Sequence, residues 1–239
     1  MALDATPPVR ALLFDVFGTV VDWRASLVRH LEAFGRERGL DADWTGLVDA
    51  WRGAYRPSMD RVRRGELPWT VLDDLHRSSL ATLSEERGLG LDDAALDRLA
   101  LLWRALDPWP DTLPGLARLR ARFTLAPLSN GNVALLVAMA KHAGLPWDTV
   151  FGTDLFGHYK PDPETYLGAC RLLRLAPAEV MLVAAHNSDL AAARALGLRT
   201  GFVARPTEYG PAQTADLRAE QDWDVCATSL GELADRLGA

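Results

Sequence analysis

Four short segments carry acidic, basic and hydroxyl residues in patterns that fit covalent hydrolysis. The first is Asp15-Val-Phe-Gly-Thr19, where an acid follows an apolar run and precedes a glycine turn. A carboxylate in that place can serve as an exposed nucleophile beneath free backbone N–H groups, which can hold an anion. The Thr19 hydroxyl can hold the carboxylate by a hydrogen bond. The alternative is an ordinary aspartate that ends a strand and caps a turn.

Two further segments carry groups that can position a substrate or a charge. Ser129 and Asn130 can donate to a carboxylate, a phosphate or a leaving group, or simply cap the helix that follows. Lys160 precedes a proline and is biased toward extended backbone. Its ammonium can then reach Asp15 and keep that acid ionised. It is one of two lysines, with Lys141, among 26 basic residues, and a solvated loop lysine is the alternative.

The fourth segment runs from Ala184 to Asp189. Asp189 can orient or deprotonate a water molecule, and His186 or Asn187 can position that water. A plain helix N-cap is the competing interpretation. Each of the four segments is a weak signal alone. Because all four follow expected strands in this order, they form a strong signal together.

The elements that carry these segments alternate between strands and helices. Short apolar runs indicate buried parallel strands, and apolar residues at spacings of three and four indicate helices. Alternation with short connections favours a doubly wound α/β sheet, whose ligands bind outside the carboxyl ends of the strands. The expected strands are 10–15, 123–128, 149–152, 180–185 and 199–203, and the expected helices between them are 133–143, 163–173 and 190–196.

Between the first two expected strands lies a long stretch whose pattern is helical throughout. Leu27, Leu31 and Phe34, for example, share one face at spacings of four and three. An insertion directly after the first strand would cover the strand ends as a cap. We therefore expect an α/β core made of residues 1–21 and 107–239. We expect residues 22–106 to form an all-helical cap domain.

The composition indicates a globular protein without a basic surface. Of the 239 residues, 49% are hydrophobic, which is ordinary for a globular protein. The formal net charge of −6 argues against nucleic acid as a partner, because binding nucleic acid needs a basic surface. No apolar run approaches the ~18 residues of a membrane span, and Met1 to Arg10 lack a signal pattern. Cys170 and Cys226 lack metal-type spacing and are expected as buried free thiols. We therefore expect a cytoplasmic protein without a membrane partner.

Taken together, the four motifs resemble those of the haloacid dehalogenase superfamily over essentially the whole chain. The closer similarity is to its (S)-2-haloacid dehalogenase subfamily, whose signature resembles Asp15-Val-Phe-Gly-Thr19-Val-Val-Asp22. That resemblance implies removal of halide from small (S)-2-haloacids, giving (R)-2-hydroxyacids through an ester on Asp15, and it implies a homodimer. The subfamily is also similar to this chain at Leu128-Ser-Asn-Gly131, at Lys160-Pro with Tyr166 six residues on, and at Trp51-Arg52 in the cap.

The same resemblance implies roles for individual residues. The nucleophile, its orienting hydroxyl, the balancing cation and the groups at the hydrolytic water are Asp15, Thr19, Lys160, Asn187 and Asp189. Ser129 and the backbone N–H groups near Val16 and Phe17 would hold the substrate carboxylate, and Arg52 and Asn130 would face the halide. Phe17 and Tyr166 would exclude water, and His186 would position the hydrolytic water. Other cap arginines compete with Arg52 for the halide, namely Arg56, Arg61, Arg63 and Arg64. The cap tryptophans Trp44, Trp69 and Trp103 are expected in the interior of the cap.

Two positions favour dehalogenation over phosphate hydrolysis. Phosphatases of this superfamily carry a second aspartate two residues after the nucleophile to protonate a departing alkoxide, and here that position is Phe17. A halide leaves without a proton. The first acid of their Mg²⁺ motif aligns with Ala185, although Mg²⁺ needs several oxygen ligands. We therefore expect no metal or cofactor; a Mg²⁺-dependent phosphatase and a non-catalytic small-acid binding protein are the alternatives.

The chain also departs from the subfamily at the water site. The best-known members have Ser and Asn at the positions that align with Ala184 and His186. The water-binding role is therefore expected to pass to His186 or Asn187.

Overall fold

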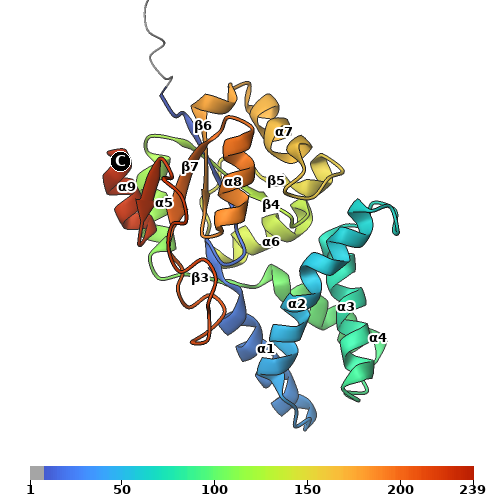
Figure 1. Ribbon diagram of the computed structural model, residues 1–239. Helices are drawn as coiled ribbons and strands as arrows, with labels where there is room; N and C mark the ends of the chain where they lie inside the picture. Colours follow the sequence, from blue (N-terminus) through green and yellow to red (C-terminus); the bar gives the residue numbers. More distant parts are fainter. Residues whose placement is uncertain (1–7) are drawn as a thin grey trace, which may run out of the picture.

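The computed structural model describes residues 8–239 (Figure 1). The prediction that Met1 to Arg10 lack a signal pattern falls mostly on residues 1–7, which lie outside the described residues. Within residues 8–239, no helix is long and apolar enough to cross a membrane. Both cysteines are free thiols; Cys170 is buried, as expected, but Cys226 is only half-buried.

A six-stranded sheet forms the centre of the core, in the order β5-β4-β1-β6-β7-β8, and all neighbouring strands are parallel. The chain moves outward from β1 to one edge and then returns to build the other, so the strands' carboxyl ends meet beside β1. The doubly wound α/β prediction is confirmed, although β8 was not predicted. The strands are β1 (Ala11–Phe14), β4 (Thr124–Ser129), β5 (Phe151–Gly152), β6 (Val180–Ala184), β7 (Arg199–Val203) and β8 (Val225–Ala227).

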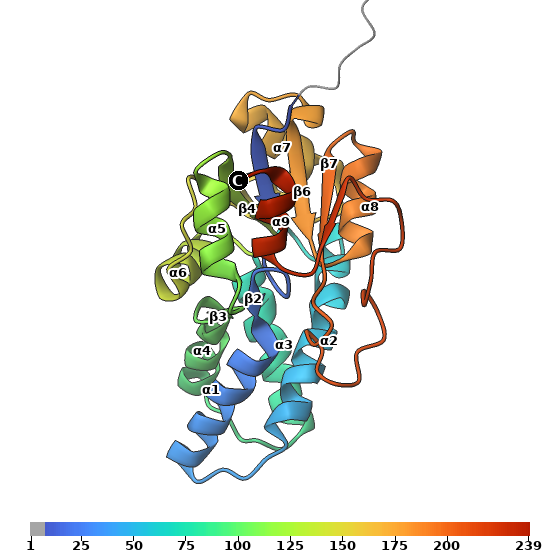
Figure 2. The same cartoon turned by 90° about the vertical axis from the view of Figure 1, so that its left-hand side faces the viewer.

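Helices cover both faces of this sheet (Figure 2). Successive strand residues point to opposite faces, so Leu12 and Phe14 join one hydrophobic cluster while Ala11 and Leu13 join the other. The first cluster includes residues of α5 (Thr112–Arg120), α6 (Val133–Ala143) and α9 (Leu230–Leu237). The second includes residues of α7 (Pro163–Leu173) and α8 (Asn187–Ala195).

A helical segment separates β1 from the rest of the core and lies beyond the carboxyl ends of the strands (Figure 2). A short antiparallel ribbon of β2 (Val21–Asp22) and β3 (Asp107–Pro108) joins its two ends. The ribbon was not predicted because two residues are too few to show alternation. That residues 22–106 form a separate cap domain stays a proposal. The helices are α1 (Trp23–Arg38), α2 (Trp44–Arg63), α3 (Leu72–Glu86) and α4 (Asp93–Ala100).

The interior of this helical segment is continuous with one face of the sheet. Trp23, Trp51 and Trp103 are fully buried and belong to the same cluster as Leu12. Burial of a large apolar side chain contributes about 1.5–3 kcal/mol, so the two parts stabilise one another. Trp69 contradicts the expectation of burial: it is 37% exposed, because it lies in the connection between α2 and α3, where its ring packs against that of Tyr159, 4.8 Å away.

Candidate active site

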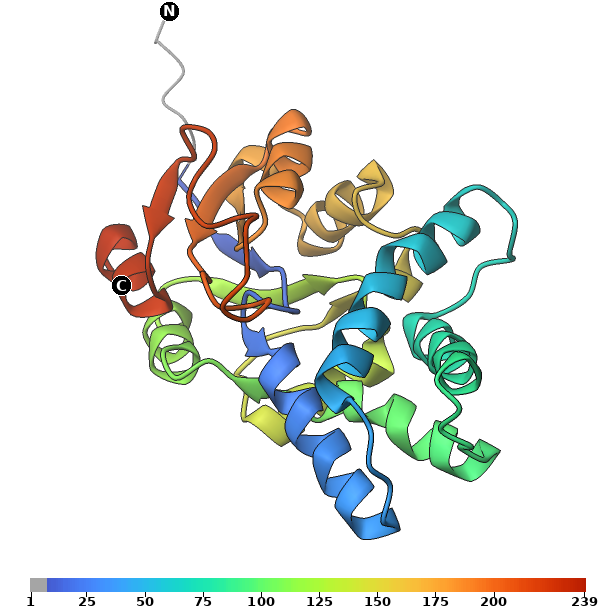
Figure 3. The same ribbon diagram turned by 60° about the horizontal axis from the view of Figure 1, so that its bottom comes forward.

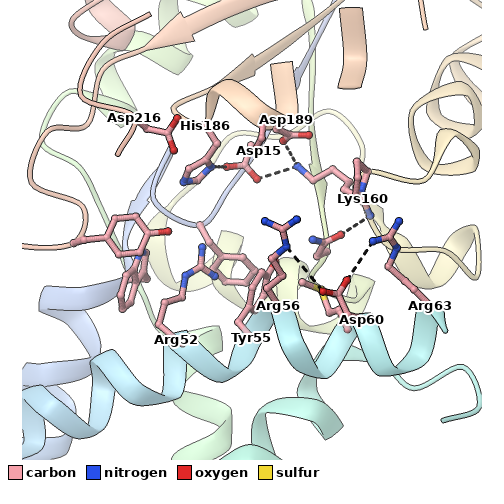
Figure 4. Close-up of a pocket in the computed structure, with 18 of the residues that line it drawn as sticks. Asp15, Arg52, Tyr55, Arg56, Asp60, Arg63, Lys160, His186, Asp189 and Asp216 are labelled. Atoms are coloured by element: carbon pink, nitrogen blue, oxygen red, sulfur yellow. Dashed lines mark hydrogen bonds and ion pairs between the residues drawn. The ribbon is translucent and has the colours of Figure 1, made fainter. Parts of the chain in front are cut away.

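A cavity of about 640 Å³ lies between the carboxyl ends of the strands and helix α2 (Figure 4). Figure 4 shows side chains of α2 reaching toward Asp15 from the side opposite the sheet. The α/β core therefore supplies one wall of the cavity, called the core wall, and the helical segment supplies the other, called the cap wall. The core wall includes Asp15, Asn130, Lys160, His186 and Asp189, and the cap wall includes Arg52, Tyr55, Arg56 and Arg63.

Asp15 follows β1 directly and is 7% exposed. Its Oδ1 accepts a hydrogen bond from Lys160 Nζ at 2.9 Å, and its Oδ2 accepts one from Thr19 Oγ1 at 2.8 Å. His186 Nδ1 lies 3.0 Å from the same Oδ2. Burial alone would raise the pKa of Asp15, but Lys160 and His186 outweigh it and hold the pKa well below its usual range. The carboxylate is therefore ionised and fixed in direction.

Lys160 links Asp15 to a second acid. Its Nζ lies 2.5 Å from Asp189 Oδ2, and the Tyr166 hydroxyl donates to Asp189 Oδ1 at 2.5 Å. The Asn130 side chain accepts from the Lys160 backbone N–H at 2.8 Å and fixes the loop. Burial would lower the pKa of Lys160, but the two carboxylates raise it above its usual range. Lys160 is thus held in its charged form between two carboxylates.

His186 lies between two carboxylates. Besides Asp15, it contacts Glu208, whose Oε2 is 2.9 Å from His186 Nε2. Glu208 is 1% exposed, and its Oε1 accepts from the indole N–H of Trp23 at 2.9 Å. Burial would lower the pKa of His186, but Glu208 and Asp15 raise it well above its usual range.

Glu208 reaches the site from the loop after β7, which approaches the start of α1 (Figure 3). Its carboxyl group fits there because position 18 is a glycine: a Cβ on Gly18 would lie 2.1 Å from the Glu208 carboxyl carbon, and the φ of Gly18 is +86°. Glu208 was not predicted from the sequence. Because ligands bind at the carboxyl ends of parallel strands, the loop after the expected strand 199–203 was a candidate region. Nothing in the sequence of that loop distinguished Glu208 from its other residues.

Arg52 is the buried arginine of the cap wall. Its guanidinium carbon lies 4.2 Å from the ring centre of Tyr55 and 5.2 Å from that of Trp23. Nη2 is 3.9 Å from Glu208, while Nη1 has no hydrogen-bond partner in the described part of the chain. The competing arginines are more exposed or paired: Arg56 is 83% exposed, and Arg63 is bonded to Asp162. Tyr55 was missed, although it lies one helical turn after Arg52.

Four expected residues do not line the cavity, and of these only Thr19 bonds Asp15 directly. The side chain of Asn187 points to another loop: its Nδ2 donates to Asp216 at 2.8 Å, and its Oδ1 accepts from Trp223 at 2.9 Å. Ser129 is fully buried, and its hydroxyl oxygen accepts from the Gly131 N–H at 3.1 Å. Neither they nor Val16 lines the cavity, whereas Phe17, Tyr166 and His186 do. The structure thus places Asn187 in loop anchoring rather than at the water.

The residues of this site do not fit a magnesium ion. Mg²⁺ takes near-octahedral oxygen coordination, but Lys160 already bridges Asp15 and Asp189. Phe17 and Ala185 offer no side-chain oxygen. Among residues 8–239, no group of three His, Cys, Asp or Glu side chains could hold a metal ion.

A protein-family model described as haloacid dehalogenase-like hydrolase matches residues 9–197. The chain belongs to this family. It is 30% identical over 217 residues to (S)-2-haloacid dehalogenase 4A of Burkholderia cepacia, over 84% of this chain and 87% of the relative. The resemblance inferred from the motifs is therefore confirmed.

Solved structures of this family are similar along almost the whole chain. The L-2-haloacid dehalogenase PA0810 is 59% identical, with a TM-score of 0.95, over 96% of this chain and 99% of that one. The defluorinating L-2-haloacid dehalogenase Rha0230 is 47% identical, with a TM-score of 0.94, over 97% and 96%.

Proposed function

We propose that this chain hydrolyses the carbon–halogen bond of small (S)-2-haloacids, giving (R)-2-hydroxyacids through an ester on Asp15, without a metal. The observation that carries the proposal is the ionised Asp15, held by Lys160 in a cavity that also contains the cation Arg52, whose side chain is only 10% exposed. In a site that only bound an anionic substrate, a carboxylate at position 15 would weaken binding, because it repels the substrate's negative charge. A nucleophile for carbon needs this charge.

The first step forms the ester. Asp15 attacks carbon 2 of the haloacid in line, and the carbon–halogen bond breaks with its electron pair on the halide. The forked guanidinium of Arg52 suits an anion, and its free Nη1 can donate to the halide or to the substrate carboxylate. Phe17, Tyr55 and Tyr166 line the cavity and keep bulk water from the reacting carbon.

The second step hydrolyses the ester. Asp189 takes a proton from a water molecule, which attacks the Asp15 carboxyl carbon. Lys160 contacts both acids, so it can pass that proton to the departing alkoxide. Inversion at carbon 2 occurs in the first step alone, which gives the (R)-product.

The position of Phe17 supports halide as the leaving group. A phosphate ester releases an alkoxide, which needs a proton from a nearby acid, whereas a halide leaves unprotonated. Phe17 lies where the superfamily's phosphatases carry that acid, and its ring packs edge-on against Trp103 at 5.6 Å. Phe17 therefore offers the leaving group no proton.

Halide release from (S)- and (R)-2-chloropropionate in EDTA tests this function. Release from the (S)-form alone, with (R)-lactate as product, is the expected result. Phosphate release from an ester after addition of Mg²⁺, without halide release, would contradict it, and so would tight binding of a haloacid without turnover. An (S)-2-fluoropropionate assay asks whether the activity named for Rha0230 extends to this chain. A homodimer stays a prediction, which light scattering can test.

A further inference from the structure

The two oxygens of the Asp15 carboxylate are not equivalent. Oδ2 faces two partners, Thr19 Oγ1 at 2.8 Å and His186 Nδ1 at 3.0 Å, whereas Oδ1 faces Lys160 alone at 2.9 Å. A carboxylate oxygen has about two lone-pair sites, so both sites of Oδ2 are occupied and one site of Oδ1 is free. Oδ1 is therefore the oxygen that can attack carbon, and Oδ2 becomes the carbonyl oxygen of the ester.

The contacts of His186 also fix its protonation. Its two ring nitrogens lie 3.0 Å and 2.9 Å from oxygens of Asp15 and Glu208. Ionised carboxylates only accept hydrogen bonds, so each nitrogen must carry a hydrogen. His186 is then an imidazolium, which has no lone pair to take a proton from water. Its role at this site is that of a donor rather than a base.

We propose that His186 stabilises the oxyanion that develops on Asp15 Oδ2 when water attacks the ester, and that Glu208 is the positioning residue that holds His186 there. The inference rests on the proposed function. The two donors to Oδ2, Thr19 and His186, lie within the 2.7–3.1 Å typical of an oxyanion hole. Thr19 is held in turn, because its oxygen accepts from the Ala185 N–H at 2.9 Å.

Atoms and protons balance in this step. The water oxygen bonds to the Asp15 carboxyl carbon, the π pair moves to Oδ2, and the released water proton goes to Asp189. On collapse, the pair on Oδ2 restores the double bond, and the bond from carbon to Oδ1 breaks. The alkoxide takes a proton from Lys160, which recovers one from Asp189. The second water proton leaves the Asp15 carboxyl for solvent, and nothing is oxidised or reduced.

The burial of Glu208 supports a role beyond chance contact. A buried carboxylate without partners costs several kcal/mol, and Glu208 is 1% exposed. Its two oxygens are taken by Trp23 and His186, with Arg52 at 3.9 Å. Through His186, this otherwise irregular loop acts on the nucleophile.

Single-turnover kinetics with (S)-2-chloropropionate test the proposal. Chloride release and the mass of the acid-quenched protein would be followed in the wild type, His186→Asn and Glu208→Gln. The matched control is Glu220→Gln, an exposed acid on the same loop. We expect all four proteins to release one equivalent of chloride per site. The ester should decay as fast in Glu220→Gln as in the wild type, about 10²-fold to 10³-fold more slowly in His186→Asn, and about 10-fold more slowly in Glu208→Gln.

The pH profile distinguishes a donor from a base. If His186 donates, ester decay in the wild type falls as pH rises through the pKa of His186, and in Glu208→Gln this fall moves to lower pH because an anion has been removed. If His186 is a base, decay rises with pH instead. Asp15 and Glu208 contact the imidazole directly. The further charged groups are Arg52 and Asp22 near Glu208, Lys160 on Asp15, and Asp189 and Asp216 in the cavity lining.

Ester decay and chloride release separate the role of His186 from the proposed function. Unchanged ester decay in both site variants, or decay that rises with pH through this range, overturns the role of His186 while chloride release upholds the proposed function. No chloride release by the wild type would overturn the function itself. The wild-type profile needs no substitution, so it decides between donor and base even if a variant melts at a lower temperature than the control.

Discussion

The two walls of the cavity differ in how far their polar atoms are satisfied. On the core wall, both carboxylate oxygens of Asp15, Asp189 and Glu208 have hydrogen-bond partners. On the cap side, Arg52 Nη1, which lines the cavity, has none within residues 8–239. The ring nitrogens of His76, which stacks on Tyr55 outside the cavity lining, have none there either. A buried polar atom without a partner costs about 1–3 kcal/mol. The core wall is thus complete before substrate arrives, whereas the cap wall retains an unused donor on Arg52.

The difference follows from the elements that build each wall. The core wall comes from the ends of parallel strands, whose positions the sheet fixes, and it holds the reacting groups in one arrangement. The cap wall comes mainly from helix α2, where Arg52 and Tyr55 lie three residues apart and share a face. We infer that the core supplies the chemistry and that the cap supplies binding energy for an anion.

Replacing Asp15 by Asn breaks the core wall and should have the largest effect. The amide keeps the shape but removes the nucleophile, so halide release should fall by at least about 10⁴-fold. The variant should be purified and its mass checked, since deamidation would restore the acid. Undiminished release by the intact amide would show that Asp15 is not the nucleophile.

Replacing Arg52 by Lys tests the cap wall. Lysine keeps the charge but loses the fork and the stacking on Tyr55, so KM for (S)-2-chloropropionate should rise about 10²-fold with a smaller change in kcat. Arg61→Lys, on the same helix and 54% exposed, is the matched control. Equal effects in the two variants would mean that Arg52 has no special part in binding.

Replacing Tyr166 by Phe should have a smaller effect on the core wall. It removes one hydrogen bond to Asp189 but leaves the contact with Lys160. We expect kcat to fall about 10-fold, from the roughly 0.5–1.5 kcal/mol of one hydrogen bond, with KM nearly constant. A change in KM alone, measured by steady-state chloride release, would place Tyr166 in binding instead.

Replacing His76 by Phe should affect stability more than catalysis. His76 stacks on Trp103 at 4.1 Å, and Phe keeps this contact without two unpartnered nitrogens. The free energy of unfolding in urea should rise by about 1 kcal/mol. The exposed His142→Gln is the control, with an expected change within about 0.5 kcal/mol.

The advantage of His76→Phe should also depend on pH. Burial, followed by the charge of Arg52, lowers the pKa of His76 well below its usual range. The unfolded chain, with an ordinary histidine pKa of about 6.5, then binds more protons than the folded one, so wild-type stability falls as pH drops below that value. The difference between variant and wild type should therefore grow toward pH 5. A constant difference would mean that His76 is not held neutral.

Much of the fold and part of the site could be predicted from the sequence. Strand-end patterns carry local information, and this is why Asp15, Lys160 and Asp189 were expected near one another, as the structure places them. Asn187 was different: helix α8 begins three residues earlier than expected, at Asn187 itself, which turns that side chain toward the 216–223 loop. Glu208 could not be selected, because its contact with His186 depends on the path of an irregular loop.

Trp23, one of eight tryptophans in the chain, lies where its indole can report on this site. Its indole N–H donates to Glu208, its ring stacks on Trp103 at 6.2 Å, and the Arg52 guanidinium lies 5.2 Å from its centre. The emission of an indole responds to the electric field of nearby charges. Arrival of an anion at Arg52 and loss of charge at Asp15 change that field at different moments. Fluorescence of the unlabelled protein can therefore time substrate capture and ester breakdown within one turnover.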